Sequence, residues 1–211
     1  MPDETPNRSA EIRNSGGDAQ GSAGEQSPLQ ARAAFLANWD WESVIRLNRG
    51  VCERGRAQHG TNSESFAAVG REWQERRLLE TALGEVLDYL RACHRRAPFL
   101  FFNGNTFADI ARTFSDYLLA ELPRGRRREA TSAVAHYVAG VLDRDAMARI
   151  LEELCEAASF QPGDRVKTLR GSMRGTIVRL LPDGRVVWRA DSGAELTALP
   201  ESLLRDSKPN Q

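Results

Sequence analysis

The sequence predicts an α+β protein, with a multi-helix N-terminal bundle over residues 28–158 followed by a small β unit over residues 160–205. In the first range, apolar residues recur every three or four positions, which is the rhythm of helices with one buried face. At Pro162-Gly163 this rhythm changes to alternation. The short apolar runs that follow are separated by glycine-containing turns, a pattern typical of antiparallel strands.

The two ends of the chain, residues 1–27 and 206–211, are expected to be disordered tails. The first is rich in Gly, Ser, Asp, Glu, Gln and Asn, so it cannot bury enough apolar surface to offset its ordering entropy. It also lacks the positive start and apolar run of a signal peptide. No stretch approaches the roughly 18 apolar residues that cross a bilayer. We therefore expect a cytoplasmic protein with no membrane partner, and three widely spaced cysteines that stay reduced.

Caps and apolar faces place about six helices in the first range. Ser27-Pro28 is an N-cap followed by proline at the first helical position. Thr106 with Asp109 resembles a capping box, with Asp in place of the usual Glu. The expected helices are residues 28–36, a second capped by Asp40 and reaching Cys52, a long third from Ser63 or Ser65 to about Arg95, a fourth from Thr106 to Leu122, a fifth over residues 130–141, and a sixth capped by Asp143 and reaching Ala158.

The most unusual loop follows the long helix. Four large apolar residues, Phe99–Phe102, are expected to be core inserted between helices, and Asn103-Gly104-Asn105 follows them. Asn103 and Asn105 are candidate binding residues, because amides at an exposed helix start can bind an anion or the backbone of a partner. A tight turn explains the same residues, since Asn and Gly tolerate left-handed φ while Thr106 caps the next helix.

The densest positive cluster consists of Arg124, Arg126, Arg127 and Arg128. It falls at a helix N-terminus, where positive charge meets the unfavourable end of the helix dipole. That placement suggests binding to phosphate or to an acidic protein. A solvated turn beside Glu129 is the simpler alternative.

The C-terminal range contains four expected strands and two turns, at Pro182-Asp183-Gly184 and Asp191-Ser192-Gly193, that favour hairpins. The strands are residues 165–169, 173–181, 185–190 and 194–199, and residues 200–204 suggest a final single turn. This pattern, with Gly163-Asp164-Arg165-Val166 and Gly175-Thr176-Ile177-Val178 at its start, resembles small SH3-like barrels of the KOW and Tudor kind. The resemblance covers about the last quarter of the chain. It implies the barrel fold and no single function, because such barrels host RNA, protein and methylated-peptide binders alike.

Basic residues outnumber acidic ones in this range. Arg174, Arg185 and Arg189, together with Trp188, are candidates for a nucleic-acid surface that works by charge and stacking. Trp188 lies in an alternating strand, so it could instead belong to the core. A cage for methylated lysine needs several aromatic residues around the cation, and this range has only two.

The sequence favours binding over catalysis. There is no G-x-S-x-G elbow, no phosphate-binding glycine loop and no metal-ligand spacing around the three histidines. We expect no cofactor and no metal, and no small molecule is indicated. The formal net charge of zero argues against coating nucleic acid through bulk charge. The leading hypothesis is a non-enzymatic adaptor, assembly or regulatory protein that binds a protein partner. A nucleic-acid-binding protein that uses the barrel arginines and Arg124–Arg128 is the second, and an enzyme with an unrecognised site is the third.

Overall fold

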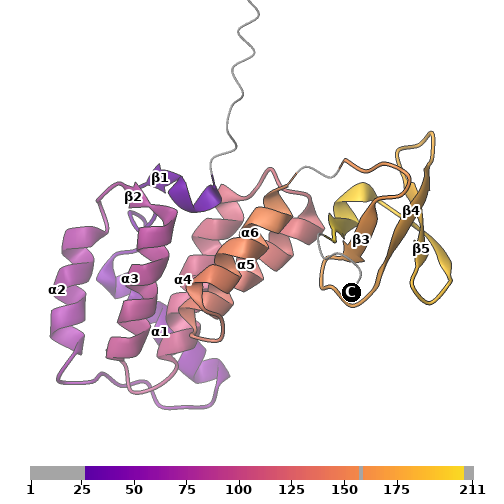
Figure 1. Ribbon diagram of the computed structural model, residues 1–211. Coiled ribbons are helices and arrows are strands. Elements are labelled where there is room, and N and C mark those ends of the chain that lie inside the picture. The colour runs from indigo at the N-terminus through magenta and orange to yellow at the C-terminus, as the bar shows by residue number, and fades with distance from the viewer. Residues whose placement is uncertain (1–26, 157–158, 207–211) are drawn as a thin grey trace, which may run out of the picture.

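The structure is a computed structural model that describes residues 27–156 and 159–206. The predicted tails therefore lie outside the described residues, except for Ser27 and Asp206. Asp206 is buried, and its backbone N–H donates to the Arg165 carbonyl at 2.9 Å, so it belongs to the folded part. Figure 1 shows a helical region on one side and a sheet on the other, with α5 and α6 between them.

Six α-helices are present in the described residues, as expected in number. They are α1 (Trp41–Arg54), α2 (Phe66–Arg76), α3 (Leu83–Arg96), α4 (Asn103–Leu118), α5 (Arg124–Val138) and α6 (Arg144–Cys155). Asp40 and Asp143 cap α1 and α6 as predicted, because their side chains accept hydrogen bonds from Ser43 N and Ala146 N.

Two expected helices differ from the prediction. The segment after Ser27 forms only a 3₁₀ turn, η1 (Pro28–Gln30), and then a two-residue strand, β1 (Arg32–Ala33). This strand pairs antiparallel with β2 (Thr81–Ala82), which separates α2 from α3. The predicted long helix is therefore wrong, because pairing between distant segments of backbone interrupts it. The number of helices is still six because the helix expected over residues 28–36 is absent and the expected long helix is divided into α2 and α3.

The start of α4 also differs from the prediction. The helix begins at Asn103, so Asn103-Gly104-Asn105 forms its first turn rather than a loop. Thr106 is not the N-cap; its hydroxyl donates to the Phe102 carbonyl at 2.9 Å from within the helix. Left-handed φ is adopted by Phe102 itself, at 56°.

The helical core is built around aromatic rings. Trp73 is fully buried against Phe107, and the Trp41 ring stacks on Phe99 with a centroid separation of 5.9 Å. Leu204 of the sheet region also joins this core, which joins the two regions by apolar packing. Among the described residues, no helix is both long and apolar enough to cross a membrane.

The C-terminal region is a five-stranded antiparallel sheet in the order β6-β5-β4-β3-β7. Gly184 and Gly193 have positive φ in its hairpin turns, as predicted. The predicted final turn is shorter than expected, with the 3₁₀ turn η2 (Pro200–Ser202) followed by a fifth strand. The strands are β3 (Arg165–Thr168), β4 (Arg174–Leu180), β5 (Val186–Ala190), β6 (Glu195–Ala198) and β7 (Leu203–Arg205).

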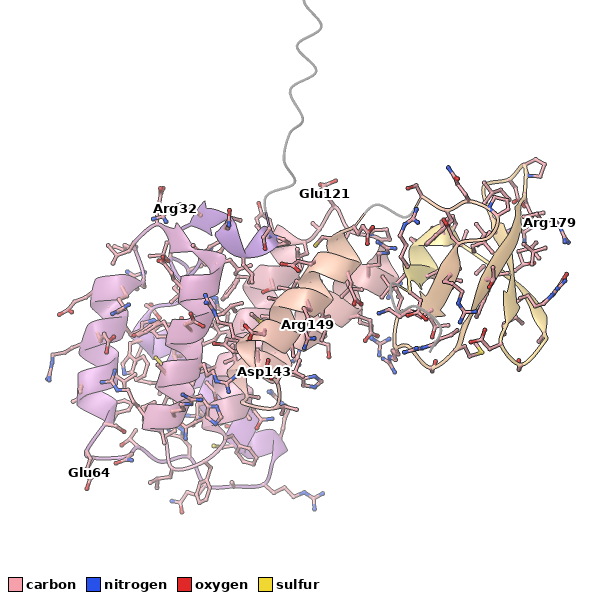
Figure 2. The ribbon with its side chains drawn as sticks, viewed as in Figure 1. Arg32, Glu64, Glu121, Asp143, Arg149 and Arg179 are labelled. Carbon is pink, nitrogen blue, oxygen red and sulfur yellow. The ribbon has the colours of Figure 1, made fainter. Side chains whose placement is uncertain are left out.

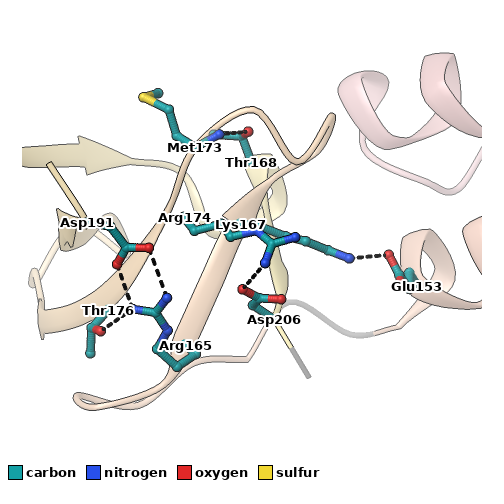
Figure 3. Close-up of polar contacts among 9 residues, drawn as sticks. All are labelled: Glu153, Arg165, Lys167, Thr168, Met173, Arg174, Thr176, Asp191 and Asp206. Atoms are coloured by element: carbon teal, nitrogen blue, oxygen red, sulfur yellow. Dashed lines mark hydrogen bonds and ion pairs between the residues drawn. The ribbon is translucent and has the colours of Figure 1, made fainter. Parts of the chain in front are cut away.

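The sheet has an apolar face and a polar face. Trp188, Val166 and Ile177 share a small core on the first face. On the other face, Lys167 reaches across to Glu153 of α6 with an N–O distance of 2.7 Å (Figure 3). Part of the polar face therefore lies against the helical region.

Candidate functional site

The connection between α3 and α4 has a strained backbone. Residues 98–101 lie between two residues with positive φ, 47° at Ala97 and 56° at Phe102. Neither is glycine, and left-handed backbone costs an ordinary residue about 1–2 kcal/mol. Such strain persists only where the surroundings impose it, and it concentrates at functional sites.

Hydrogen bonds impose the strained conformation. Two loop amides are held, Phe99 N by Asn103 Oδ1 at 3.0 Å and Leu100 N by Gly60 O at 3.0 Å. Five of the six carbonyls from Ala97 to Phe102 also accept hydrogen bonds. The donors are Ser65 Oγ to Ala97 at 3.1 Å, Asn62 N to Pro98 at 2.8 Å, Asn103 Nδ2 to Phe99 at 2.7 Å, Asn48 Nδ2 to Phe101 at 3.0 Å and Thr106 Oγ1 to Phe102 at 2.9 Å.

Asn48 of α1 is the buried centre of this network. Its Nδ2 donates to the Phe101 carbonyl and, at 2.9 Å, to Thr106 Oγ1. Its Oδ1 lies 2.9 Å from His59 Nδ1. Because an amide oxygen can only accept, the Nδ1 of His59 carries a proton. Asn48 therefore ties α1, the segment after it and the α3–α4 loop together.

The neighbouring Cys52 and His59 do not form a nucleophile and base. The Cys52 thiol is buried and donates to Asn48 Oδ1 at 3.6 Å. Burial raises the pKa of this thiol, with a smaller contribution from Glu53. Burial lowers the pKa of His59, and Arg49 adds to the shift. A thiol that stays protonated is a poor nucleophile, so the network is structural.

The loop directs its side chains in two directions. Phe99 is buried, whereas Leu100 is 58% exposed and Phe101 is 49% exposed. The prediction that the whole Phe99–Phe102 run is core is therefore wrong for the two middle residues. Four consecutive bulky side chains on a non-helical segment cannot all face one side, and that constraint is the sequence signal for these missed residues.

Leu100 lies directly over the backbone of Gly60. A Cβ on Gly60 would come within 2.6 Å of Leu100 Cδ1, so a larger residue there would force Leu100 to move. The loop (Pro98–Phe102) thus holds the Leu100 side chain against Gly60 and the Phe101 carbonyl against Asn48. It lies beside the start of α2, close to Glu64, which Figure 2 labels at one end of the helical region.

The two asparagines predicted as binding residues have different positions. Asn103 exchanges hydrogen bonds with both backbone groups of Phe99, so it fixes the loop between α3 and α4. Asn105 is exposed at the edge of a hollow of about 660 Å³ beside the first turn of α4, which His94 and His136 also line. In the described residues no group of three His, Cys, Asp or Glu side chains could hold a metal ion.

The predicted arginine cluster is divided by the fold. Arg126 is 4% exposed and donates to four backbone carbonyls, so its guanidinium is not available to a ligand. These carbonyls belong to Leu154 (3.1 Å), Glu156, Glu201 (3.0 Å) and Leu203 (2.7 Å), on both sides of the helix–sheet junction. Arg127 pairs with Asp116 at 3.3 Å. Arg124 and Arg128 are exposed and have no carboxylate within 4 Å among the described residues.

The predicted surface of the sheet is neutralised in pairs. Arg174 lies 3.6 Å from Asp206, Arg185 lies 2.6 Å from Asp183, and Arg189 lies 2.7 Å from Glu195. Figure 3 shows Arg174 facing Asp206, and beside it Arg165 bonded to both oxygens of Asp191. Trp188 is 2% exposed within the apolar core. Its ring therefore offers no surface for stacking a base, and the open question about this residue is answered in favour of the core.

Comparison with protein-family models, with curated proteins and with solved structures gave no match for this chain.

Proposed function

We propose that the protein is a non-enzymatic adaptor or assembly protein that binds a protein partner through residues Pro98–Phe102, which we call the docking loop. The observation that carries this proposal is the loop's strained backbone, which hydrogen bonds hold at five of six carbonyls and at the amides of Phe99 and Leu100 while Leu100 and Phe101 are exposed. A rigid apolar pair loses little conformational freedom on binding, so more of its burial energy is available for affinity. Aromatic side chains are enriched in protein interfaces and among the residues that dominate binding energy.

For the C-terminal region we propose an SH3-like barrel fold. Support comes from the topology, in which the first strand of the sheet, β3, pairs with the last, β7, and a single 3₁₀ turn precedes the last strand. Cys52 and Cys93 are buried free thiols, which supports a reducing compartment such as the cytoplasm.

The electrostatics of the sheet favour a protein partner over nucleic acid. Each Lys or Arg within residues 160–206 has a carboxylate oxygen within 4 Å. These pairs join Arg165 to Asp191, Lys167 to Glu153, Arg170 to Glu129, Arg174 to Asp206, Arg179 and Arg189 to Glu195, Arg185 to Asp183 and Arg205 to Asp164. Nucleic-acid binding relies on basic side chains that are free to replace counterions on phosphates. Paired arginines offer less of this attraction.

The second candidate function is nucleic-acid binding, and the observation that favours it is the pair of free arginines, Arg124 and Arg128. Both are exposed at the start of α5, without carboxylate partners in the part of the chain that the structure describes. Two charges give weak, salt-sensitive binding, so this function ranks second.

Affinity capture of the tagged, full-length protein from its native lysate tests the proposal, with and without nuclease. Three proteins are compared. They are the wild type, a Leu100→Ser/Phe101→Ser variant, and a matched Leu78→Ser/Leu79→Ser control that removes two apolar side chains of similar exposure, 61% and 54%.

We expect a stoichiometric protein partner that survives nuclease treatment with the wild type and the control and is lost with the docking-loop variant. Equal thermal melting of the two variants excludes unfolding as the cause. Retention of the partner by the Leu100→Ser/Phe101→Ser variant would contradict the proposal. Recovery of nuclease-sensitive material alone would favour the second function and direct attention to Arg124 and Arg128.

A further inference from the structure

We propose that the partner surface is acidic: an apolar pocket that receives Leu100 and Phe101, with carboxylates on its rim that face three arginines of this chain. The inference rests on the proposed function of the docking loop and specifies the chemistry of its partner. The three arginines, Arg49, Arg54 and Arg56, lie on the C-terminal half of α1 and in the turn after it.

We call Arg49, Arg54 and Arg56 the arginine border. Contacts made by the turn after α1 place it next to the docking loop. Arg56 follows Gly55, whose Cβ position would lie 2.3 Å from the Phe102 ring. Arg49 lies one turn before Cys52 and Glu53 on α1, and the His59 ring that follows this helix lies 5.9 Å from the Phe99 ring. Arg56 therefore lies beside Phe102, at the α1 side of the docking loop, while Glu64 is the acidic residue close to the loop at the start of α2.

The charge of the arginine border is incompletely balanced. Arg54 lies 3.8 Å from Asp109, but that carboxylate also pairs with Arg112 at 2.7 Å. Arg49 and Arg56 are exposed and have no carboxylate within 4 Å among the described residues, although Glu53 lies on the same stretch of helix. This differs from the sheet, where every cation has a partner. Arginine, together with aromatic side chains, is enriched in protein interfaces, and complementary charge guides docking and selects the partner.

The backbone of Arg56 gives a second, independent reason to assign these arginines a role. Arg56 has φ of 55° just after α1, and its N–H and that of Ala57 donate to the carbonyls of Glu53 and Cys52. This is the position that closes a helix and is usually occupied by glycine, because glycine adopts positive φ without strain. Here a guanidinium is present at a position where glycine would fold better. It is also one of three non-glycine residues with positive φ in the described chain; Phe102 ends the docking loop, Ala97 precedes it, and Arg56 follows Gly55, which contacts Phe102.

The test begins with a photo-crosslinking phenylalanine analogue at position 101, and with the same analogue at position 79 as the control. The adduct formed in the native lysate is identified, and that partner is purified. Its dissociation constant is then measured at low and high salt. The full-length proteins compared are the wild type, Arg49→Gln/Arg54→Gln/Arg56→Gln, and a charge-matched control, Arg32→Gln/Arg149→Gln/Arg179→Gln, whose residues lie in other parts of the molecule (Figure 2).

We expect the triple variant of the arginine border to bind about tenfold more weakly than the wild type, and the charge-matched control to bind like the wild type. The difference should shrink at high salt because salt screens exposed charges. Arg56→Gly provides the sharpest single change. It should raise the melting temperature, because it relieves positive φ, while it weakens partner binding.

Three results would overturn the inference and leave the docking function in place: a dissociation constant that the triple variant does not change, binding that high salt strengthens, or an Arg56→Gly protein that binds as tightly as the wild type. An adduct at position 101 with a second copy of this chain or with nucleic acid would also overturn it. Absence of a position-specific adduct would instead contradict the proposed function.

Discussion

In both the docking loop and the helix–sheet junction, side-chain N–H groups hold backbone carbonyls, but the side chains around them differ in exposure. In the loop, Asn48 and Asn103 donate side-chain N–H groups to backbone carbonyls, and at the junction Arg126 does so for carbonyls of both regions. At the junction the adjacent side chains, Leu203 and Leu204, are buried. In the loop, Leu100 and Phe101 are exposed. Anchoring a junction that buries its apolar groups is explained by stability, whereas anchoring a loop that exposes them supports the proposed binding role.

The junction should show the larger effect on stability. Arg126→Met removes the donors to four carbonyls at a buried boundary, and each unsatisfied buried group costs about 1–3 kcal/mol. We expect the free energy of unfolding to fall by about 3 kcal/mol or more in chemical denaturation. Arg124→Met, two residues earlier and exposed, should change it by less than about 0.5 kcal/mol. Similar values for the two variants would mean that Arg126 does not hold the regions together.

Removal of the Asn48 side chain should lower the free energy of unfolding slightly less than removal of the Arg126 guanidinium. Asn48→Ala removes the donor to the Phe101 carbonyl and the acceptor of His59 Nδ1, and it leaves Thr106 Oγ1 with only its bond to the Phe102 carbonyl. We expect a loss of about 2–3 kcal/mol and faster proteolysis within the loop. Asn105→Ala, at an exposed position on α4, is the control and should be close to neutral. A neutral Asn48→Ala would show that the loop is not held by this network.

The positive φ of Ala97, just before the docking loop, predicts that a glycine there stabilises the protein. Ala97→Gly relieves positive φ at the end of α3, and we expect a gain of about 1 kcal/mol. Ala92→Gly, at an exposed position within α3, should lose about 1 kcal/mol because glycine is unfavourable inside a helix. Thermal melting of the two variants gives opposite signs if Ala97 is strained, and the same sign if it is not.

The smallest expected effect is a dependence of folding stability on pH that arises from His59 beside the loop. Burial, with Arg49, lowers the pKa of His59 in the fold, so the unfolded chain binds the proton more readily. Stability is therefore highest above the ordinary histidine pKa of about 6.5 and falls as the pH drops through the folded pKa. His59→Gln should flatten stability in this pH window, whereas His136→Gln, on exposed α5 surface, should leave the wild-type dependence. An unchanged profile for His59→Gln would contradict the shift.

Local sequence signals predicted much of the fold. Asp40 and Asp143 mark helix starts with their own side chains, and Gly184 and Gly193 mark hairpins through their positive φ. Each of these features is decided by neighbouring residues, so it can be read from a short window. For the same reason, the change from helical to alternating periodicity predicted that helices precede Pro162 and strands follow it.

The features that escaped prediction depend on distant contacts. The break between α2 and α3 requires β1, about fifty residues earlier in the chain. The burial of Arg126 requires carbonyls from α6, η2 and β7, which no local pattern brings together. Asn103 is predicted as a binding residue at an exposed helix start, and in the structure its side chain instead bonds both backbone groups of Phe99. The exposure of Leu100 and Phe101 was missed because an apolar run predicts burial until its neighbours are known.

Amide hydrogen exchange of the free protein tests most directly whether the docking loop is rigid while its side chains are exposed. The N–H groups of Phe99 and Leu100 donate to Asn103 Oδ1 and to the Gly60 carbonyl. If the loop is anchored as described, both amides exchange as slowly as those in the middle of α4. Exchange at the rate of an unstructured peptide would contradict the account, because a flexible loop with two apolar residues would carry no preorganised binding surface.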